Sequence, residues 1–390
     1  MSWPEQRARF PVLRTHAYLN AGTFGPLARE TIDAMATLRA WEGEHGRGGK
    51  AYFEAMLDRR GRVRQLLAEQ IGAPPESLAL TDSTTQGVHV VVTGLHLGPD
   101  DEIVTSDAEH FGLTGPLAAS GARLRIAAVR GRPAAEYLER LAALVTPRTR
   151  LIALSAVSWI DGTRFPWAEL RAATGVPVLI DGAQAAGAIA VDAHASDFFT
   201  VSAQKWLCGP DATGALYVRD ADALAPRLVA YPSAESYDIA EGTWVPRAGA
   251  LRFDTTFTPA SSLAGLEAAL TGLPEGRFER AHALTEHCRE RCSQPATRSS
   301  PSRARARSCR SACRATRPRR WSGSTKPASS CASCPARACC ARASAGGTTS
   351  PTSSGWSQRC RPSSPAIGCS AAITLAMCSS SSSPSSSAPS

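Results

Sequence analysis

Apolar runs and amphipathic stretches alternate along most of the first 290 residues. Predominantly apolar runs predict buried strands at 78–80, 102–106, 124–129, 151–155, 176–180 and 198–201. Apolar residues at helical spacing predict helices at 28–41, 52–71, 88–95, 134–144, 263–270 and 278–292. Strands that alternate with helices over residues 75–220 indicate an α/β fold, in which helices cover both faces of a mostly parallel sheet.

Polar side chains follow two of these predicted strands directly. Asp181 is the first polar residue after the strand at 176–180, and Lys205 follows the strand at 198–201 within the run Ser-Ala-Gln-Lys. In open parallel sheets, ligands bind at the carboxyl ends of the strands. The acid and the lysine are therefore expected to face one crevice.

Two turns rich in glycine or hydroxyl groups precede predicted helices. Residues 18–26 predict a short strand that runs into a glycine-rich turn, which can approach a ligand closely. Residues 81–87 form a hydroxyl-rich turn before a helix, an arrangement that suits a phosphate. The alternative for this second turn is a helix cap served by Ser83 or Thr84. His110 follows the strand at 102–106, where a solvated loop histidine is the ordinary alternative to a catalytic one.

Lysine is scarce in the chain before its last hundred residues. Lys50 and Lys205 are the two lysines among the 29 basic residues of positions 1–292, so Lys205 is unusual as a mere surface charge. Arginine stays protonated and cannot add to a carbonyl, whereas a desolvated lysine amine can form a Schiff base. The structural alternative is a lysine at a strand end that pairs with Asp181 or Asp211.

The acid and the lysine together indicate pyridoxal phosphate as cofactor. A carboxylate at Asp181 would keep the pyridine nitrogen protonated, so that the ring can withdraw electrons from a substrate carbanion. Gln184 lies three residues further on and is placed to donate to the ring hydroxylate, although an amide in this position can also simply cap a helix.

These motifs resemble those of the class V aminotransferase group of fold-type I pyridoxal-phosphate enzymes, which includes cysteine desulfurases, selenocysteine lyases, kynureninases and isopenicillin N epimerase. Residues 181–185, Asp-Gly-Ala-Gln-Ala, are similar to the ring-nitrogen motif of that group. Residues 202–205, followed by Gly209, Pro210 and Gly214, are similar to its lysine motif. The resemblance covers about residues 18–270 and implies a seven-stranded-type, mostly parallel sheet.

The resemblance also implies a role for each matching position. Lys205 would form the internal aldimine and move the substrate's α-proton, Asp181 would pair with the pyridinium, and His110 would stack on the ring face. Gln184 would contact the ring hydroxyl, and Thr258 would reach the phosphate of the neighbouring subunit in a homodimer. The residues implied to hold the phosphate within the same subunit are Thr84, Thr85, Ser202 and Gln204.

Two positions depart from the cysteine desulfurase branch. Gln204 stands where that branch usually has histidine, and the run Ser158-Trp159-Ile160 stands where it usually has an asparagine. Aminotransferase, desulfurase or lyase, and epimerase reactions on an amino-acid substrate therefore all stay open. In the family, the arginine that binds the substrate carboxylate lies in a small C-terminal domain.

Composition changes sharply where that small domain should be. Residues 293–390 contain fourteen Lys or Arg and no Asp or Glu, so the net charge of +9 divides into +14 there and −5 before it. Nine of the twelve cysteines also lie there, including Cys331 and Cys334, which would suit half of a zinc site. The segment has no histidine and few aromatics, so we expect neither a metal site nor nucleic-acid binding. A shifted reading frame beginning near Cys292 explains its composition better.

The resulting organisation is an N-terminal segment 1–20, a cofactor-binding domain 21–272, the start of a small domain at 273–292, and the tail 293–390. No signal-like apolar core or run of about eighteen apolar residues is present, which predicts a cytoplasmic protein with no membrane partner. The favoured function is a pyridoxal-phosphate enzyme whose small-molecule substrate is an amino acid. The alternative is a disabled product that binds cofactor but has lost its small domain.

Overall fold

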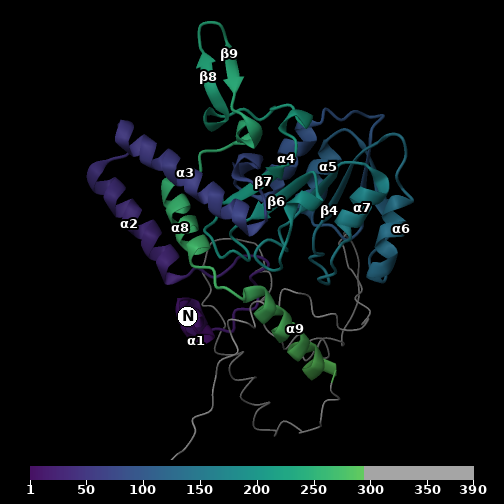
Figure 1. Ribbon diagram of the computed structural model, residues 1–390, viewed down its shortest axis with the longest axis horizontal. Coiled ribbons are helices and arrows are strands. Elements are labelled where there is room, and N and C mark those ends of the chain that lie inside the picture. Colours follow the sequence, from purple (N-terminus) through teal and green to yellow (C-terminus); the bar gives the residue numbers. More distant parts are fainter. Residues whose placement is uncertain (294–390) are drawn as a thin grey trace, which may run out of the picture. The chain divides into compact units, whose positions relative to one another are not determined.

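A computed structural model describes residues 1–293 of the chain (Figure 1). Its centre is a seven-stranded sheet with the strand order β1-β7-β6-β5-β4-β2-β3. Strand β7 is antiparallel to both of its neighbours, and the other pairs in this sheet are parallel. The strands are β1 (Leu78–Thr81), β2 (Glu102–Ser106), β3 (Arg123–Ala127), β4 (Thr149–Ser155), β5 (Val178–Asp181), β6 (Phe198–Ser202) and β7 (Gly214–Val218).

Helices cover both faces of this sheet (Figure 1). Helices α4 and α5 pack on one face, while α3, α6, α7 and α8 contribute buried side chains to the other. The helices are α1 (Trp3–Ala8), α2 (Arg29–His45), α3 (Lys50–Gln70), α4 (Thr84–Gly94), α5 (Phe111–Ala119), α6 (Tyr137–Ala142), α7 (Trp167–Thr174), α8 (Ala260–Thr271) and α9 (Arg277–Ser293). The predicted α/β architecture with a mostly parallel seven-stranded sheet is confirmed.

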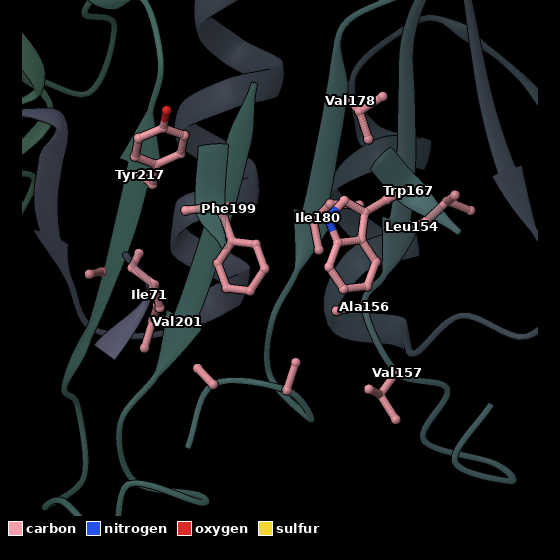
Figure 2. Packing of buried hydrophobic residues seen from close by; sticks show 14 of the residues in the cluster. Ile71, Leu154, Ala156, Val157, Trp167, Val178, Ile180, Phe199, Val201 and Tyr217 are labelled. Carbon is pink, nitrogen blue, oxygen red and sulfur yellow. The ribbon is translucent and has the colours of Figure 1, made fainter. Parts of the chain in front are cut away.

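Successive residues of the central strands enter two separate cores. On β5, Val178 and Ile180 belong to the core under α3, α7 and α8, whereas Leu179 belongs to the core under α4 and α5. Figure 2 shows Phe199 of β6 and Trp167 of α7 within the first of these cores. Because both faces are buried, the strands consist of continuous apolar runs, which is why the sequence pattern located them.

Some local predictions differ from the structure. No strand forms at the start of residues 18–26, where the backbone has irregular and turn conformations instead. The sequence pattern also missed α1, α5 and α7, and the hairpin of β8 (Ala234–Asp238) and β9 (Thr243–Pro246), which projects from the rest of the fold (Figure 1). The predicted helix at 134–144 is a short 3₁₀ turn followed by α6.

Within the part of the chain that the structure describes, no helix is long and apolar enough to cross a membrane. Within residues 1–293, no group of three or more potential ligands could hold a metal ion. The predictions for the tail, including its cysteine pair and the shifted reading frame, fall outside the described residues.

Candidate active site

A cavity of about 140 Å³ lies where the carboxyl ends of β4, β5 and β6 meet the N-termini of α4 and α5. Eight of the nine predicted site residues line it, and five further residues complete its walls. The predicted ones are Thr84, Thr85, His110, Asp181, Gln184, Ser202, Gln204 and Lys205, and the added ones are Ser83, Ser155, Val157, Trp159 and Ala183. The parallel sheet therefore brings the acid and the lysine to one crevice, as expected.

Asp181 ends β5 and is 4% exposed. Its Oδ1 accepts a hydrogen bond of 2.9 Å from the backbone N–H of Ala183. Burial raises the pKa of Asp181 above its ordinary value, and the backbone bond and the nearby Lys205, His110 and Thr84 oppose that rise. A positive charge placed against this carboxylate would stabilise its ionised form.

Lys205 lies in the turn after β6 and is half-buried. Its backbone carbonyl accepts a hydrogen bond of 3.1 Å from the N–H of Cys208, which fixes the turn. Burial lowers the pKa of the Lys205 amine, and the attraction of Asp181 opposes this change. Among residues 1–293, Lys205 forms no salt bridge within 4.0 Å, so it is not the simple ion-pair partner of Asp181 or Asp211.

The turn at residues 20–25 packs against this lysine-bearing segment. The Gly25 N–H donates a hydrogen bond of 2.7 Å to the carbonyl of Gln204. A Cβ on Gly25 would lie 2.0 Å from the Lys205 carbonyl oxygen, so glycine alone allows this approach. This close approach is made to backbone, and the predicted approach of the turn to a ligand stays a prediction.

Gln204 leaves one polar atom without a partner inside the described part of the chain. Its Oε1 is buried and accepts no hydrogen bond there. An unsatisfied buried acceptor costs free energy of about 1–3 kcal/mol. Because Gln204 lines the cavity, a ligand with a hydrogen-bond donor would satisfy it.

Helix α4 directs its N-terminus at the cavity. Ser83 is the N-cap, and its Oγ accepts a hydrogen bond of 3.1 Å from the Gln86 N–H. The capping interpretation is therefore correct for Ser83, whereas Thr84 and Thr85 are the first two helical residues and line the cavity. Helix N-termini carry free N–H groups and partial positive charge, which suit a phosphate.

His110 is the N-cap of α5, and its Nδ1 accepts a hydrogen bond of 3.0 Å from the Gly112 N–H. Its ring lies edge-on to that of Trp159, with ring centroids 5.3 Å apart and planes at 89°. A Cβ on Gly112 would lie 2.8 Å from Thr85 Oγ1 and 3.1 Å from His110 Nδ1. The N-termini of α4 and α5 therefore converge beside the cavity.

Gln184 lies between the cavity and the turn at residues 20–25. Its Nε2 donates a hydrogen bond of 3.0 Å to the Gly22 carbonyl, and its Oε1 accepts one of 2.9 Å from Trp206 Nε1. An amide nitrogen carries two donors, so one remains for a ligand. The alternative of a helix cap is wrong for Gln184, because no helix begins there.

The sequence patterns gave no role to Glu109, which lies directly behind the cavity. Its Oε1 accepts a 2.6 Å hydrogen bond from the Ser106 hydroxyl, and its Oε2 accepts bonds from the Ser155 N–H and hydroxyl at 2.8 and 2.5 Å. Burial raises the pKa of Glu109 to about 7, and the charge of Asp181 adds to this effect. An acid beside a histidine at a strand end is the sequence signal that could have found it.

Thr258 does not line the cavity. It is 4% exposed and lies two residues before α8. Its predicted contact is with a neighbouring subunit, so the role of Thr258 stays a prediction. Ser155 and Trp159 were not predicted as site residues, and they join the cavity because β4 and the turn after it lie beside β5.

The residues present fit pyridoxal phosphate. A buried carboxylate suits a protonated ring nitrogen, a partly desolvated amine suits an aldehyde, and the N-terminus of α4 with its hydroxyls suits a phosphate. Gln204 adds amide N–H groups to the lining, which could donate to a phosphate, and its buried Oε1 has no hydrogen-bond partner within residues 1–293.

Comparison with known proteins decides the family. The family model described as "Aminotransferase class-V" matches residues 17–308. The chain belongs to the aminotransferase class-V family. The resemblance inferred from the two motifs is thereby confirmed, and the fold-type I assignment agrees with the solved structures that this chain is similar to.

The curated proteins that are similar to this chain are named after different reactions. Isopenicillin N epimerase of Streptomyces clavuligerus is 31% identical over 264 residues, which are 63% of this chain and 64% of that protein. Cysteine desulfurase of Enterobacter sp. (strain 638) is 31% identical over 296 residues, 69% of this chain and 72% of that protein. The chain thus spans about two thirds of the length of these curated relatives.

A similar solved structure is a C-DES mutant with glycine covalently linked to its PLP cofactor. It is 28% identical with a TM-score of 0.67, and the match covers 74% of this chain and 80% of that one. The complex of the cystine C-S lyase C-DES with its product cysteine persulfide is 29% identical with a TM-score of 0.65, covering 71% of this chain and 78% of that one.

Proposed function

We propose that this class-V family member binds pyridoxal phosphate through a Schiff base at Lys205 and acts on an amino-acid substrate. The observation that carries the proposal is the joint presence of the Asp181 carboxylate and the Lys205 amine in one cavity at the N-terminus of α4. The names of the relatives support it, because a C-DES structure carries a PLP cofactor and the curated relatives include an epimerase and desulfurases.

Each residue has a definite task in this proposal. When bound, pyridoxal phosphate supplies an electron-withdrawing ring that stabilises negative charge at the substrate's α-carbon. Asp181 holds the ring-nitrogen proton, and His110 packs against the ring face. The Lys205 amine, whose pKa burial lowers, accepts and returns the α-proton. Gln184 donates its free N–H to the ring hydroxyl.

The phosphate site is proposed to lie at the start of α4. Thr84 and Thr85 would donate hydroxyls together with the backbone N–H groups of that helix, and Ser202 and Gln204 would approach from the end of β6. Thr258 would complete the same site in a neighbouring subunit of a homodimer. We propose the cytoplasm as location and residues 21–272 as the cofactor-binding domain.

A catalytically disabled, cofactor-binding product is the second candidate function. Two observations favour it. The described lining of the cavity contains no arginine to hold a substrate carboxylate, and the chain spans only 64% of the epimerase relative. Cofactor binding and turnover must therefore be tested separately.

The test uses the purified full chain incubated with pyridoxal phosphate. We expect a visible absorption band that Lys205→Ala abolishes. Borohydride reduction of the Schiff base should remove this band and leave the cofactor bound covalently to the protein. Lys50→Ala is the matched control, because the Lys50 side chain is 88% exposed, and it should leave the band unchanged. A band that persists in Lys205→Ala would disprove the assignment.

A second measurement distinguishes the two candidates. The chain with bound cofactor is incubated with single amino acids in D₂O, and deuterium at the α-carbon is measured by mass spectrometry. Exchange that depends on Lys205 supports an active enzyme, since it requires removal of the α-proton. If the absorption band forms but no amino acid takes up deuterium at its α-carbon, the result supports the disabled product.

A further inference from the structure

The turn after β4 holds an aromatic side chain at the cavity. Within this turn, the Ser158 N–H donates to the Thr163 carbonyl at 2.8 Å, and the Gly162 N–H donates to the Ser158 carbonyl at 2.9 Å. The Ser158 hydroxyl accepts a hydrogen bond of 3.2 Å from the Ile160 N–H. These bonds fix the backbone on both sides of Trp159, so its position does not depend on a mobile loop.

Trp159 lines the cavity and yet keeps 52% of its surface exposed. One edge contact, to the ring of His110, orients the indole. Ile160, which follows Trp159, is 39% exposed and Phe111, which follows His110, is 80% exposed, although neither lines the cavity. Exposed large apolar groups at the wall of a pocket mark a surface that a ligand can cover.

Charged groups are few in the described lining. Asp181, Lys205 and His110 are its ionisable residues, and the proposed function assigns all three to the cofactor. A substrate carrying a second carboxylate or an ammonium in its side chain would therefore meet the indole of Trp159 without a described partner for its charge. Removing such a charge from water without a partner is strongly unfavourable.

We infer that Trp159 determines substrate specificity and that the amino acid accepted by this site has an apolar side chain, of the leucine or phenylalanine class. The inference rests on the proposed function, since it concerns the substrate of the same site. The indole packs against the apolar side chain beside the reacting carbon.

The experiment measures binding and needs no turnover. Full-length protein freed of cofactor is titrated calorimetrically with two stable reduced adducts, N-phosphopyridoxyl-L-leucine and N-phosphopyridoxyl-L-aspartate. These compounds share the cofactor part and differ in the amino-acid side chain. We expect the leucine adduct to bind at least about tenfold more tightly, the scale on which apolar pockets discriminate.

The variant Trp159→Asn should reduce that ratio to near one, while Trp159→Phe should keep most of it. Trp41→Asn is the matched control, because Trp41 is another partly exposed tryptophan, on α2 outside this cavity, and the ratio should not change. Equal affinities in the wild type, or a preference that survives Trp159→Asn, would overturn the inference. Failure of the wild type to bind pyridoxal phosphate or either adduct would overturn the proposed function, and this inference with it.

Discussion

Burial shifts the two central ionisable groups of the cavity toward their uncharged forms. It raises the pKa of Asp181 and lowers the pKa of Lys205, and their mutual attraction opposes both shifts. A neutral amine is the form that attacks a carbonyl, so the fold prepares Lys205 for its proposed reaction. A cationic ring nitrogen beside Asp181 would restore the carboxylate, so cofactor binding and ionisation of this acid are coupled.

Glu109 makes a pH-dependent contribution to stability that can be measured without cofactor. Because burial raises its pKa to about 7 from an ordinary 4.5, the folded protein binds this proton more tightly than the unfolded chain does. Its stabilising contribution is full below about pH 4.5 and is lost as the pH rises to 7. At about 1.4 kcal/mol per pKa unit, the loss is at most roughly 3 kcal/mol.

We therefore expect Glu109→Gln to gain stability relative to the wild type as the pH rises from 5 to 7.5. The amide oxygen can accept the Ser155 bonds and the amide nitrogen can donate to the Ser106 hydroxyl, but the amide cannot ionise. Urea unfolding at both pH values measures the difference. A wild-type-minus-variant difference that does not change with pH would show that Glu109 titrates normally.

Among single residues, the sequence alone located those site side chains that come shortly after a buried strand. Asp181 and Lys205 could be located from the apolar runs before them, and lysine scarcity drew further attention to Lys205. Trp159 and Ser155 reach the cavity only because β4 lies beside β5, which no local pattern encodes. Glu109 carries a sequence signal beside His110, but its hydrogen bonds to Ser106 of β2 and Ser155 of β4 depend on how the strands are arranged.

Among the secondary-structure elements, one buried carboxylate joins three segments. Asp254 accepts hydrogen bonds from Arg60 and Arg64 of α3 at 2.8 Å each, and from the backbone N–H of Leu80 in β1 at 2.7 Å. Both arginines and the aspartate are less than 10% exposed. The carboxylate therefore ties α3 to the first strand and to the chain that enters α8.

We expect Asp254→Ala to destabilise the protein by about 3–5 kcal/mol, because it leaves two buried guanidinium groups without their carboxylate. Glu267→Ala is the control, since Glu267 pairs with Arg59 and Arg62 nearer the surface and should cost only about 1 kcal/mol or less. Chemical denaturation measures both. Equal losses of unfolding free energy for the two variants would show that the buried Asp254 carboxylate stabilises the fold no more than the more exposed Glu267 does.

The missed elements have physical explanations. Helix α5 contains two glycines and Pro116, so its propensity is low, yet the His110 cap and the burial of Leu113 and Leu117 stabilise it. The strand predicted at the start of residues 18–26 does not form because the Asn20 carbonyl accepts hydrogen bonds from the N–H groups of Thr23 and Phe24, which make a local turn instead of a pairing with a neighbouring strand. Tertiary contacts stabilise α5, whereas a local turn replaces the predicted strand.

For the whole molecule, the described lining of the cavity comes from one continuous part of the chain. All thirteen lining residues lie between Ser83 and Lys205. We therefore expect a chain that ends at Ser293 to form the same absorption band with pyridoxal phosphate as the full chain. Parallel titrations measure both affinities. A more than tenfold weaker affinity in the shorter chain would mean that residues after 293 contribute to cofactor binding.

The pairing of β1 with β7 joins residues far apart in the sequence, since Leu78 faces Tyr217 across 217 − 78 = 139 positions. During synthesis, β1 emerges from the ribosome long before its partner exists. At about 5–20 residues per second, this edge stays unpaired for roughly 7–28 seconds. Residues after Ser293 are translated only when all seven strands of the sheet have been made, so the sequence of residues 294–390 comes too late to change how the ribosome-bound chain begins to assemble this sheet.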